Sequence, residues 1–151
     1  MLEKTLVLDT MNIQFAKSEP EIRACFPAFS ELRPHLTEDA FVSQVARQMR
    51  NHGYTVVYIL DQGQVVAAAG YRVAEFLAWG ITFYLDDLIT IRSARKNGYA
   101  GMLMDWLLKE AKNLGCKQFH LDSGTHRHDA HRLYMGRKLQ ISSHHFSKDV
   151  E

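Results

Sequence analysis

The chain has few cysteines, few prolines and no excess of either charge. Its 151 residues include only Cys25 and Cys116, which lie far apart and outside any C-x-x-C pair. That usage favours reduced thiols in a cytoplasmic protein over a disulfide-stapled one. Lysine plus arginine total 18 and aspartate plus glutamate 17, a formal net charge of +1. Bulk attraction to nucleic acid or an anionic membrane is therefore disfavoured, and any anion site must be local.

Long apolar runs are also missing. Segment 1–9 is interrupted by Glu3 and Lys4, so it does not read as a signal peptide. No stretch approaches the roughly 20 apolar residues of a membrane helix. We expect no membrane partner and a cytoplasmic location. The composition, 46% hydrophobic and 23% charged, is that of an ordinary globular protein. The length fits a single domain spanning 1–151, since domains usually have about 100–200 residues.

Apolar periodicity and turn residues predict a chain of alternating strands and helices. A capping box at Ser18–Glu21 opens the first helix, which Pro27 should kink or end early. A second helix follows Thr37 and stops at Gly53. The remaining expected elements are a strand at 11–17, a hairpin of 54–60 and 65–73, a strand at 81–91, a helix at 99–114, a strand at 117–122, a short helix around 130–134 and a last strand at 141–146. This order gives a mixed α/β sheet with helices on its faces.

The most informative segment is 85–101, where a strand runs into a turn that opens a helix. The first amides of a helix have no partner inside it, and Gly98 and the small Ala100 allow an anion to approach the backbone. Arg92, Arg95 and Lys96 add positive charge. We interpret the segment as a pyrophosphate cradle, although a helix start without a ligand remains an alternative. The nucleoside-triphosphate and dinucleotide glycine fingerprints do not match.

The pattern Arg95-x-x-Gly98-x-Ala100 resembles the [QR]-x-x-G-x-[GA] signature of the GNAT superfamily of acetyl-CoA-dependent N-acetyltransferases. The pattern follows a long strand and opens an amphipathic helix. Two helices and a hairpin precede it, and a strand and a tyrosine-bearing helix follow. The resemblance covers about 11–146. It implies an α/β (α+β) fold with a mixed, mainly antiparallel central sheet flanked by helices, in which the fourth and fifth strands splay apart.

The resemblance also implies acetyl-CoA as the cosubstrate and no metal. The pantetheine arm would pair with the backbone of the fourth strand, at Ile89, Thr90 and Ile91. The turn would hold the pyrophosphate through Arg95, Lys96, Asn97, Gly98, Tyr99, Ala100 and Gly101. The implied reaction moves an acetyl group to a primary amine by direct transfer in a ternary complex.

Tyr134 matches the family's general acid, which protonates the leaving thiolate. Its alternative role is a core aromatic. Asp86 and Asp87 are candidates for the general base, with Glu75 or a histidine acting through water as alternatives, although both aspartates could also be solvated edge charges. Two adjacent aspartates disfavour regular strand pairing, so we expect a local distortion there. Strand alternation would turn them to opposite sides and leave at most one facing the cleft.

Two positions depart from the family pattern. Arg127 stands where an asparagine is common, seven residues before the tyrosine, and Lys138-Leu139 replaces a Gly-Phe pair. Six of the eight histidines fall between His120 and His145. His128 and His131 have the spacing of neighbours on one helix face, but a closed zinc site needs two more ligands in register, so we expect no metal.

The sequence does not identify the acceptor. A small-molecule amine and a peptide or protein amine both fit, and a homodimer is left open. A non-catalytic acyl-CoA-binding or regulatory module on the same fold is the alternative to an enzyme, and the tyrosine at 134 favours the enzyme.

Overall fold

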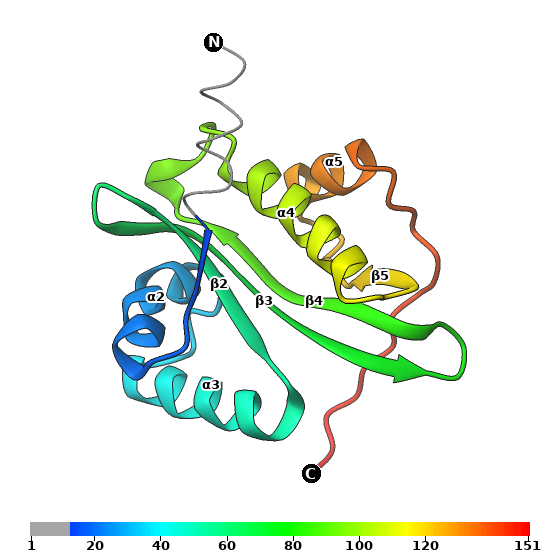
Figure 1. Ribbon diagram of the computed structural model, residues 1–151, viewed down its shortest axis with the longest axis horizontal. Helices are drawn as coiled ribbons and strands as arrows, with labels where there is room; N and C mark the ends of the chain where they lie inside the picture. The colour runs from blue at the N-terminus through cyan, green and yellow to red at the C-terminus, as the bar shows by residue number, and fades with distance from the viewer. Residues whose placement is uncertain (1–12) are drawn as a thin grey trace. The chain divides into compact units, whose positions relative to one another are not determined.

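The computed structural model describes residues 13–151 (Figure 1). Residues 11–12 of the first expected strand lie outside this range. The strands are β1 (Ile13–Phe15), β2 (Thr55–Asp61), β3 (Gln64–Phe76), β4 (Gly80–Thr90) and β5 (Gln118–Leu121). The helices are α2 (Glu19–Leu32), α3 (Glu38–His52), the short 3-10 helix η1 (Arg92–Ala94), α4 (Tyr99–Asn113) and α5 (His128–Gly136).

The five strands form one sheet in the order β1-β2-β3-β4-β5. The pairs β1–β2, β2–β3 and β3–β4 are antiparallel, and β5 runs parallel to β4. The Lys117 N–H donates to the Ile81 carbonyl at 2.7 Å, near the start of both strands. Since β5 has four residues and β4 has eleven, β5 flanks only part of β4. This arrangement confirms the expected mixed, mainly antiparallel sheet.

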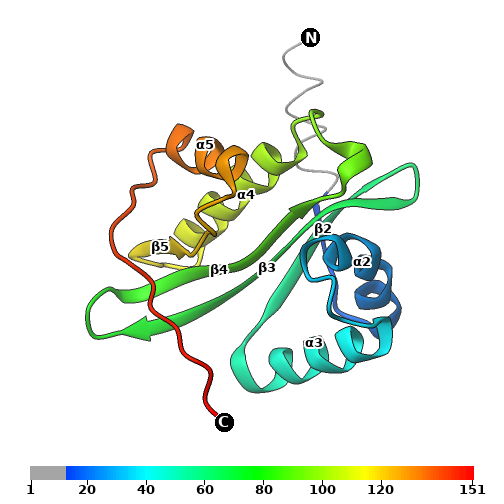
Figure 2. The ribbon, with the colours of Figure 1, turned by 180° about the vertical axis from the view of Figure 1, so that it is seen from behind.

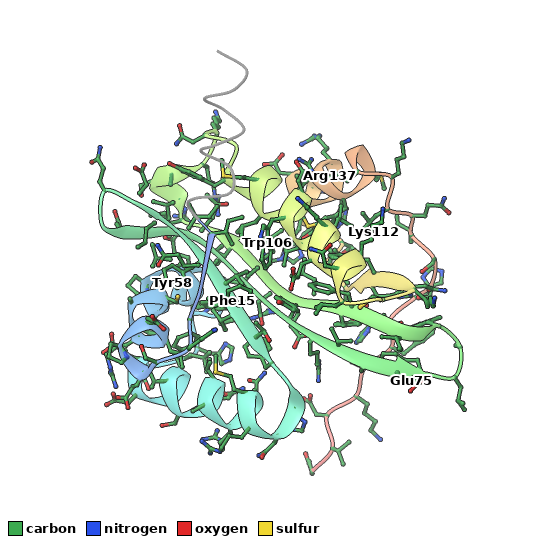
Figure 3. All side chains as sticks on the ribbon, viewed as in Figure 1. Phe15, Tyr58, Glu75, Trp106, Lys112 and Arg137 are labelled. Carbon is green, nitrogen blue, oxygen red and sulfur yellow. The ribbon has the colours of Figure 1, made fainter. Side chains whose placement is uncertain are left out.

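Helices cover both faces of the sheet. Figures 1 and 2 show α2 and α3 on one side of the strands and α4 on the other. Fully buried side chains of β4 and α4, such as Phe83, Leu103 and Leu107, form the core on the α4 side. Phe15 of β1 meets Trp106 of α4 edge to face, with ring centroids 5.6 Å apart (Figure 3). The sheet is thus fixed from both sides, which is what holds β4 in place.

The local signals place the first two helices well. The capping box at Ser18 and Glu21 is formed, and Gly53 ends α3 in the left-handed conformation at φ 64°. Pro27 does not end α2, which continues to Leu32. The turn after the proline is buried through Phe29 and Leu32. Burial of that turn offsets the roughly 3 kcal/mol that an interior proline costs a helix.

The expected last strand at 141–146 is wrong. Residues 137–151 contain no helix or strand, and Ile141 and Phe146 are 78% and 91% exposed. Within 141–146 only Ile141 and Phe146 are apolar, and a strand also needs a partner for its backbone groups. No strand of the described range pairs with it.

The described residues fall into two compact units, 13–120 and 121–151. The first unit holds β1 to β4, all the helices up to α4 and most of β5. The second holds α5, where the His131 ring lies 2.9 Å from the Gly124 carbonyl, and an ion pair of 3.2 Å between His145 and Asp122. Within residues 13–151, none of the helices has the length and apolar character needed to span a membrane.

Candidate active site

The centre of the candidate site is a β-bulge in β4 at Asp86. Gly70 of β3 lies opposite Asp87, and the next residue, Tyr71, lies opposite Leu85, so Asp86 has no opposite residue. A glycine inside a strand and two adjacent aspartates both weaken regular pairing. The local distortion expected from the sequence is therefore present, and the register locates it at one residue.

The bulge turns both aspartates to the same face of the sheet. Asp87 shares a face with Gly70, its opposite residue, and Arg72 lies two residues further along β3 on that same face. Asp86 contacts Arg72, since the Arg72 Nε donates to Asp86 Oδ1 at 3.2 Å. The strict alternation that would separate the two side chains does not hold, because the extra residue shifts the pattern by one position.

Asp87 is fully engaged by the protein. The Tyr54 hydroxyl donates to Asp87 Oδ2 at 2.6 Å, and Arg33 donates to Asp87 Oδ1 from Nε at 3.1 Å and from Nη2 at 2.8 Å. Arg33 directly follows α2, and Tyr54 directly follows the glycine that ends α3. The ends of α2 and α3 thus direct the Arg33 guanidinium and the Tyr54 phenol at the Asp87 carboxylate. Both oxygens of Asp87 accept hydrogen bonds from them.

Tyr54 reaches Asp87 because residue 70 is glycine. A Cβ at position 70 would lie 1.7 Å from the Tyr54 hydroxyl oxygen, far inside any contact distance. Burial raises the pKa of the Tyr54 phenol well above its usual value, and the nearby negative charge of Asp87 raises it further. Tyr54 therefore remains a neutral hydrogen-bond donor that fixes Asp87.

Asp86 keeps one oxygen free. Within residues 13–151 its Oδ2 accepts no hydrogen bond, while its Oδ1 is held by Arg72. Burial raises the pKa of the Asp86 carboxyl, Arg72 opposes the rise, and the charge of Asp87 adds to it. A carboxylate with a raised pKa and a free oxygen is the better proton acceptor of the pair.

Glu75, the other acidic candidate, lies elsewhere. It is opposite Ile81 near the end of the β3–β4 hairpin and is exposed (Figure 3). It is five residues along β3 from Gly70, or about 17 Å at the ~3.4 Å rise of a strand. Its odd spacing from Gly70 also places it on the other face of the sheet. The structure does not bring Glu75 to the bulge.

Beyond the bulge, the backbone groups of β4 alternate between β3 and the opposite edge of the strand. The Ile91 N–H donates to the Val66 carbonyl of β3 at 2.9 Å. Antiparallel alternation then directs the N–H and C=O groups of Ile89 and Ile91 toward β3, and those of Leu88 and Thr90 toward the opposite edge. The side chains of Ile89 and Ile91 are buried, which fixes the strand in the core.

Thr90 also carries an unpaired buried group. Its Oγ1 is one of two buried side-chain polar atoms without a hydrogen-bond partner in the described range. A buried hydroxyl without a partner costs free energy unless something pairs with it. The unpaired Oγ1 and the outward backbone make Thr90 a candidate contact for a polar ligand.

The turn after β4 exposes a row of amides. Gly98 caps α4 in the left-handed conformation, with φ 82°, and a Cβ there would meet nothing within 4 Å. The first hydrogen bond of α4 runs from the Met102 N–H to the Gly98 carbonyl at 3.0 Å, so the preceding amides of the helix have no helical acceptor. The open space and these amides suit a phosphate.

Side chains hold this turn in shape. The Asn97 side-chain amide donates to the Ala94 carbonyl at 2.9 Å, and the Tyr99 hydroxyl donates to Asp61 Oδ2 at 2.8 Å. Arg95 and Lys96 are exposed and make no hydrogen bond through their side chains within 13–151. The Arg95 and Lys96 side chains are therefore available to bind an anion. The Tyr99 hydroxyl is not, because it is hydrogen-bonded to Asp61 at the end of β2.

Tyr134 lies on α5, in the second compact unit. Burial raises the pKa of its phenol, and the positive charge of Arg127 partly offsets that rise. Its hydroxyl makes no hydrogen bond within residues 13–151. A neutral phenol with its hydroxyl free is able to donate a proton.

The structure adds residues that sequence reasoning did not assign. Arg72 and Tyr54 reach the bulge only through the folding of the sheet and of α3, and neither lies in a motif. Arg33 directly follows α2 and likewise lies outside the motifs. One signal was available: a glycine inside the apolar run at 65–73 is typical of a bulge or of a close approach.

Other clusters do not form a site. A hollow of about 770 Å³ lies along α2 and α3, but its lining includes no residue of the bulge or the turn. Its Arg23 is paired with Glu19, Glu38 and Asp39. Within the described range, no three histidine, cysteine, aspartate or glutamate side chains gather as a metal site would require.

Comparison with known proteins identifies the family. The acetyltransferase (GNAT) family matches residues 19–137. The uncharacterized N-acetyltransferase YhdJ of Bacillus subtilis (strain 168) is 28% identical over 134 residues, which cover 88% of this chain and 94% of that protein.

Solved structures share the fold. A transcriptional regulator from Bacillus halodurans C-125 superposes with a TM-score of 0.81 at 16% identity, covering 91% of this chain and 98% of that one. AAC(6')-Iy, solved with the bisubstrate analogue CoA-S-monomethyl-acetylneamine, gives a TM-score of 0.78 at 12% identity, covering 93% and 97%. With the family match over most of the chain, these results lead to one conclusion: the protein belongs to the GNAT family of acetyltransferases.

Proposed function

We propose that this acetyltransferase moves an acetyl group from acetyl-CoA to a primary amine, directly, within one ternary complex. The observation that carries the proposal is the bulge of β4, which leaves a single carboxylate oxygen free at Asp86 Oδ2. The same strand leads from that oxygen to the open turn before α4. A proton acceptor and an anion-binding turn on one strand are what transfer from a CoA thioester to an amine requires.

The turn is the proposed CoA site. Amides of residues 96–101 would bind the pyrophosphate, with Arg95 and Lys96 adding charge and Gly98 leaving room for the phosphate. The structural neighbour AAC(6')-Iy was solved with CoA, which supports a CoA thioester as the cosubstrate. The pantetheine arm would pair with the outward backbone of Leu88 and Thr90. Ile89 and Ile91, the other residues expected there, would contribute by anchoring the strand in the core.

The proposed chemistry divides between two residues. The amine nitrogen attacks the thioester carbon and passes its proton to Asp86 Oδ2, and the Leu88 N–H stabilises the oxyanion. The oxyanion then re-forms the C=O bond as the C–S bond breaks, and Tyr134 gives its proton to the leaving sulfur. Asp87 is not the base in this scheme because Arg33 and Tyr54 already occupy its oxygens.

Direct transfer is favoured over an acyl-cysteine intermediate. Cys25 is fully buried, and burial raises the pKa of its thiol to about 12. Burial also raises the pKa of the Cys116 thiol. A nucleophilic cysteine reacts as its thiolate, and a raised pKa keeps both thiols protonated near neutral pH.

The proposal is tested by acetyl-CoA turnover with a broad panel of small amines, peptides and protein substrates. We expect thiol release that depends on an amine and matches the amount of N-acetylated product formed. CoA binding without turnover on any amine would contradict the enzyme and favour an acyl-CoA-binding module. Thiol release without an acetylated amine would contradict amine transfer.

A further inference from the structure

Two half-exposed arginines share the face of the aspartate pair. The Arg33 and Arg72 side chains are 41% and 42% exposed, whereas those of Asp87 and Asp86 are only 15% and 14% exposed. Arg33 also donates to the Asp86 carbonyl at 3.4 Å, and Arg72 to the Asp86 side chain at 3.2 Å. A molecule that approaches Asp86 on this face therefore meets guanidinium groups as well as a carboxylate.

Most of the donors of Arg72 are unused. A guanidinium has five N–H donors, and within residues 13–151 Arg72 makes hydrogen bonds only through Nε. Its two terminal nitrogens form the edge that matches a carboxylate in two parallel hydrogen bonds. Arg33 uses Nε and Nη2 and leaves Nη1 without an acceptor in the same range. The site thus holds unused anion-binding capacity next to the free oxygen of Asp86.

The charges of this cluster balance in pairs. Arg33 pairs with Asp87 and Arg72 pairs with Asp86, at 2.8 Å and 3.2 Å. A polycationic acceptor would gain little attraction from two neutral ion pairs and would meet two half-exposed guanidiniums. An acceptor with an amine beside a carboxylate complements both the free oxygen and the free N–H edge of the Asp86–Arg72 pair.

Resting on the proposed function, we infer that the acceptor is a small amine that also carries a carboxylate. Its amine lies on Asp86 Oδ2 and its carboxylate on the terminal N–H groups of Arg72, with Arg33 Nη1 as a further donor. Arg72 is then a specificity-determining residue. This assignment separates the protein from transferases that select acceptors by positive charge alone.

The test compares α-amino acids with their carboxamides as acceptors, since each pair shares its side chain and differs only in the anionic group. A polyamine serves as the polycationic acceptor. We expect kcat/KM for at least one acid to exceed that for its amide by roughly tenfold or more, the worth of hydrogen bonds to a charged group. The amide has the less basic amine and more of it unprotonated near neutral pH, so a preference for the acid is not a consequence of amine ionisation.

Variants assign the preference to Arg72. Arg72→Gln should remove most of it by raising KM for the acid roughly 10- to 100-fold, with the KM for acetyl-CoA unchanged. Arg72→Lys keeps the charge beside Asp86 and loses the planar fork, so the preference for the acid should fall, but by less than in Arg72→Gln. Arg50→Gln, on the exposed side of α3, is the matched control and should keep the wild-type ratio.

Equal or better transfer to the amides or the polyamine, or transfer to neither set, would overturn the inference. A preference for acids that survives both Arg72 variants would overturn the role of Arg72. In each of these cases amine-dependent thiol release with other acceptors would leave the proposed function standing. Absence of acetyl-CoA binding by the wild-type protein would instead contradict the proposed function itself.

Discussion

The bulge of β4 and the turn before α4 are adjacent in sequence, yet they are built in opposite ways. At the bulge, side chains from β3 and from the ends of α2 and α3 converge on Asp86 and Asp87, and one carboxylate oxygen remains free. At the turn, the site is formed by the backbone. Gly98 takes a left-handed conformation, and the first amides of α4 have no helical acceptor. The first region is specified by long-range contacts and the second by local sequence, so substitutions should affect them differently.

The largest effect is expected at the turn. Gly98→Glu places a negative charge and a side chain where the phosphate would lie, and should weaken CoA binding at least about 100-fold. Calorimetric or fluorescence titration with CoA measures this. The substitution also lowers stability through backbone strain, since a left-handed residue other than glycine costs about 1–2 kcal/mol.

Gly53→Glu is the matched control for that strain. Gly53 also has a positive φ, 64°, and open space around its Cβ position, but it ends α3. The Gly53→Glu variant should lose about as much stability as Gly98→Glu and should bind CoA with wild-type affinity. If Gly98→Glu folds and binds CoA as the wild-type protein does, the anion site is not at this turn.

The second effect concerns the proposed acid. Tyr134→Phe keeps the ring and removes only the proton donor, so kcat should fall about 10²–10⁴-fold while CoA affinity is unchanged. Steady-state kinetics on a confirmed acceptor and a thermal melt measure both quantities. Tyr58→Phe is the control for loss of a tyrosine hydroxyl elsewhere, because the Tyr58 hydroxyl donates a hydrogen bond to the side chain of Gln14. Its kcat should stay near the wild-type value. A kcat within threefold of wild type, with acyl transfer limiting, would return Tyr134 to a structural role.

A smaller effect is expected from the support of the bulge. Gly70→Ala forces the Tyr54 hydroxyl away from Asp87, and overpacking of this kind costs about 1–3 kcal/mol of unfolding free energy. Chemical denaturation measures the loss. In a Tyr54→Ala background the same substitution should cost much less, since the obstructing ring is gone. Equal losses in the two backgrounds would show that the Tyr54 contact is not what requires glycine.

The smallest effect is expected at Asp87 in catalysis. Asp87→Asn keeps the shape of the side chain and the ability to accept from Tyr54, so kcat should remain within about tenfold of wild type while stability falls. A drop of 10²-fold or more in kcat, with the fold intact, would move the general base from Asp86 to Asp87.

The contrast between the turn and the bulge also explains which parts of the site the sequence could predict. Segment 95–101 carries its own signals, a glycine and positive charges after a strand, and those signals are local enough to read without a structure. The distortion at Asp86 and Asp87 was predictable as well, because two acidic residues in a strand disfavour pairing. The register shift that turns both to one face was not, since it depends on which β3 residue is opposite.

The partners of the bulge were likewise beyond local reasoning. Arg33 is 54 residues from Asp87 along the chain, and Tyr54 is 33 residues away. Contacts of that sequence separation follow from how the helices pack on the sheet. The expected strand at 141–146 was wrong for a related reason, because a segment forms a strand only where the fold supplies a partner.

The pH dependence of kcat in Asp86→Asn, beside the wild-type protein, tests the central claim most directly. Asp86 must be ionised to accept the proton, and its pKa is raised by burial. Wild-type kcat at saturating acceptor should therefore fall as the pH drops, with a midpoint above the ~3.9 of an ordinary aspartate. In Asp86→Asn that limb should vanish and kcat near neutral pH should fall about 10²–10⁴-fold. A variant that keeps the wild-type limb and rate would contradict the assignment of Asp86 as the base.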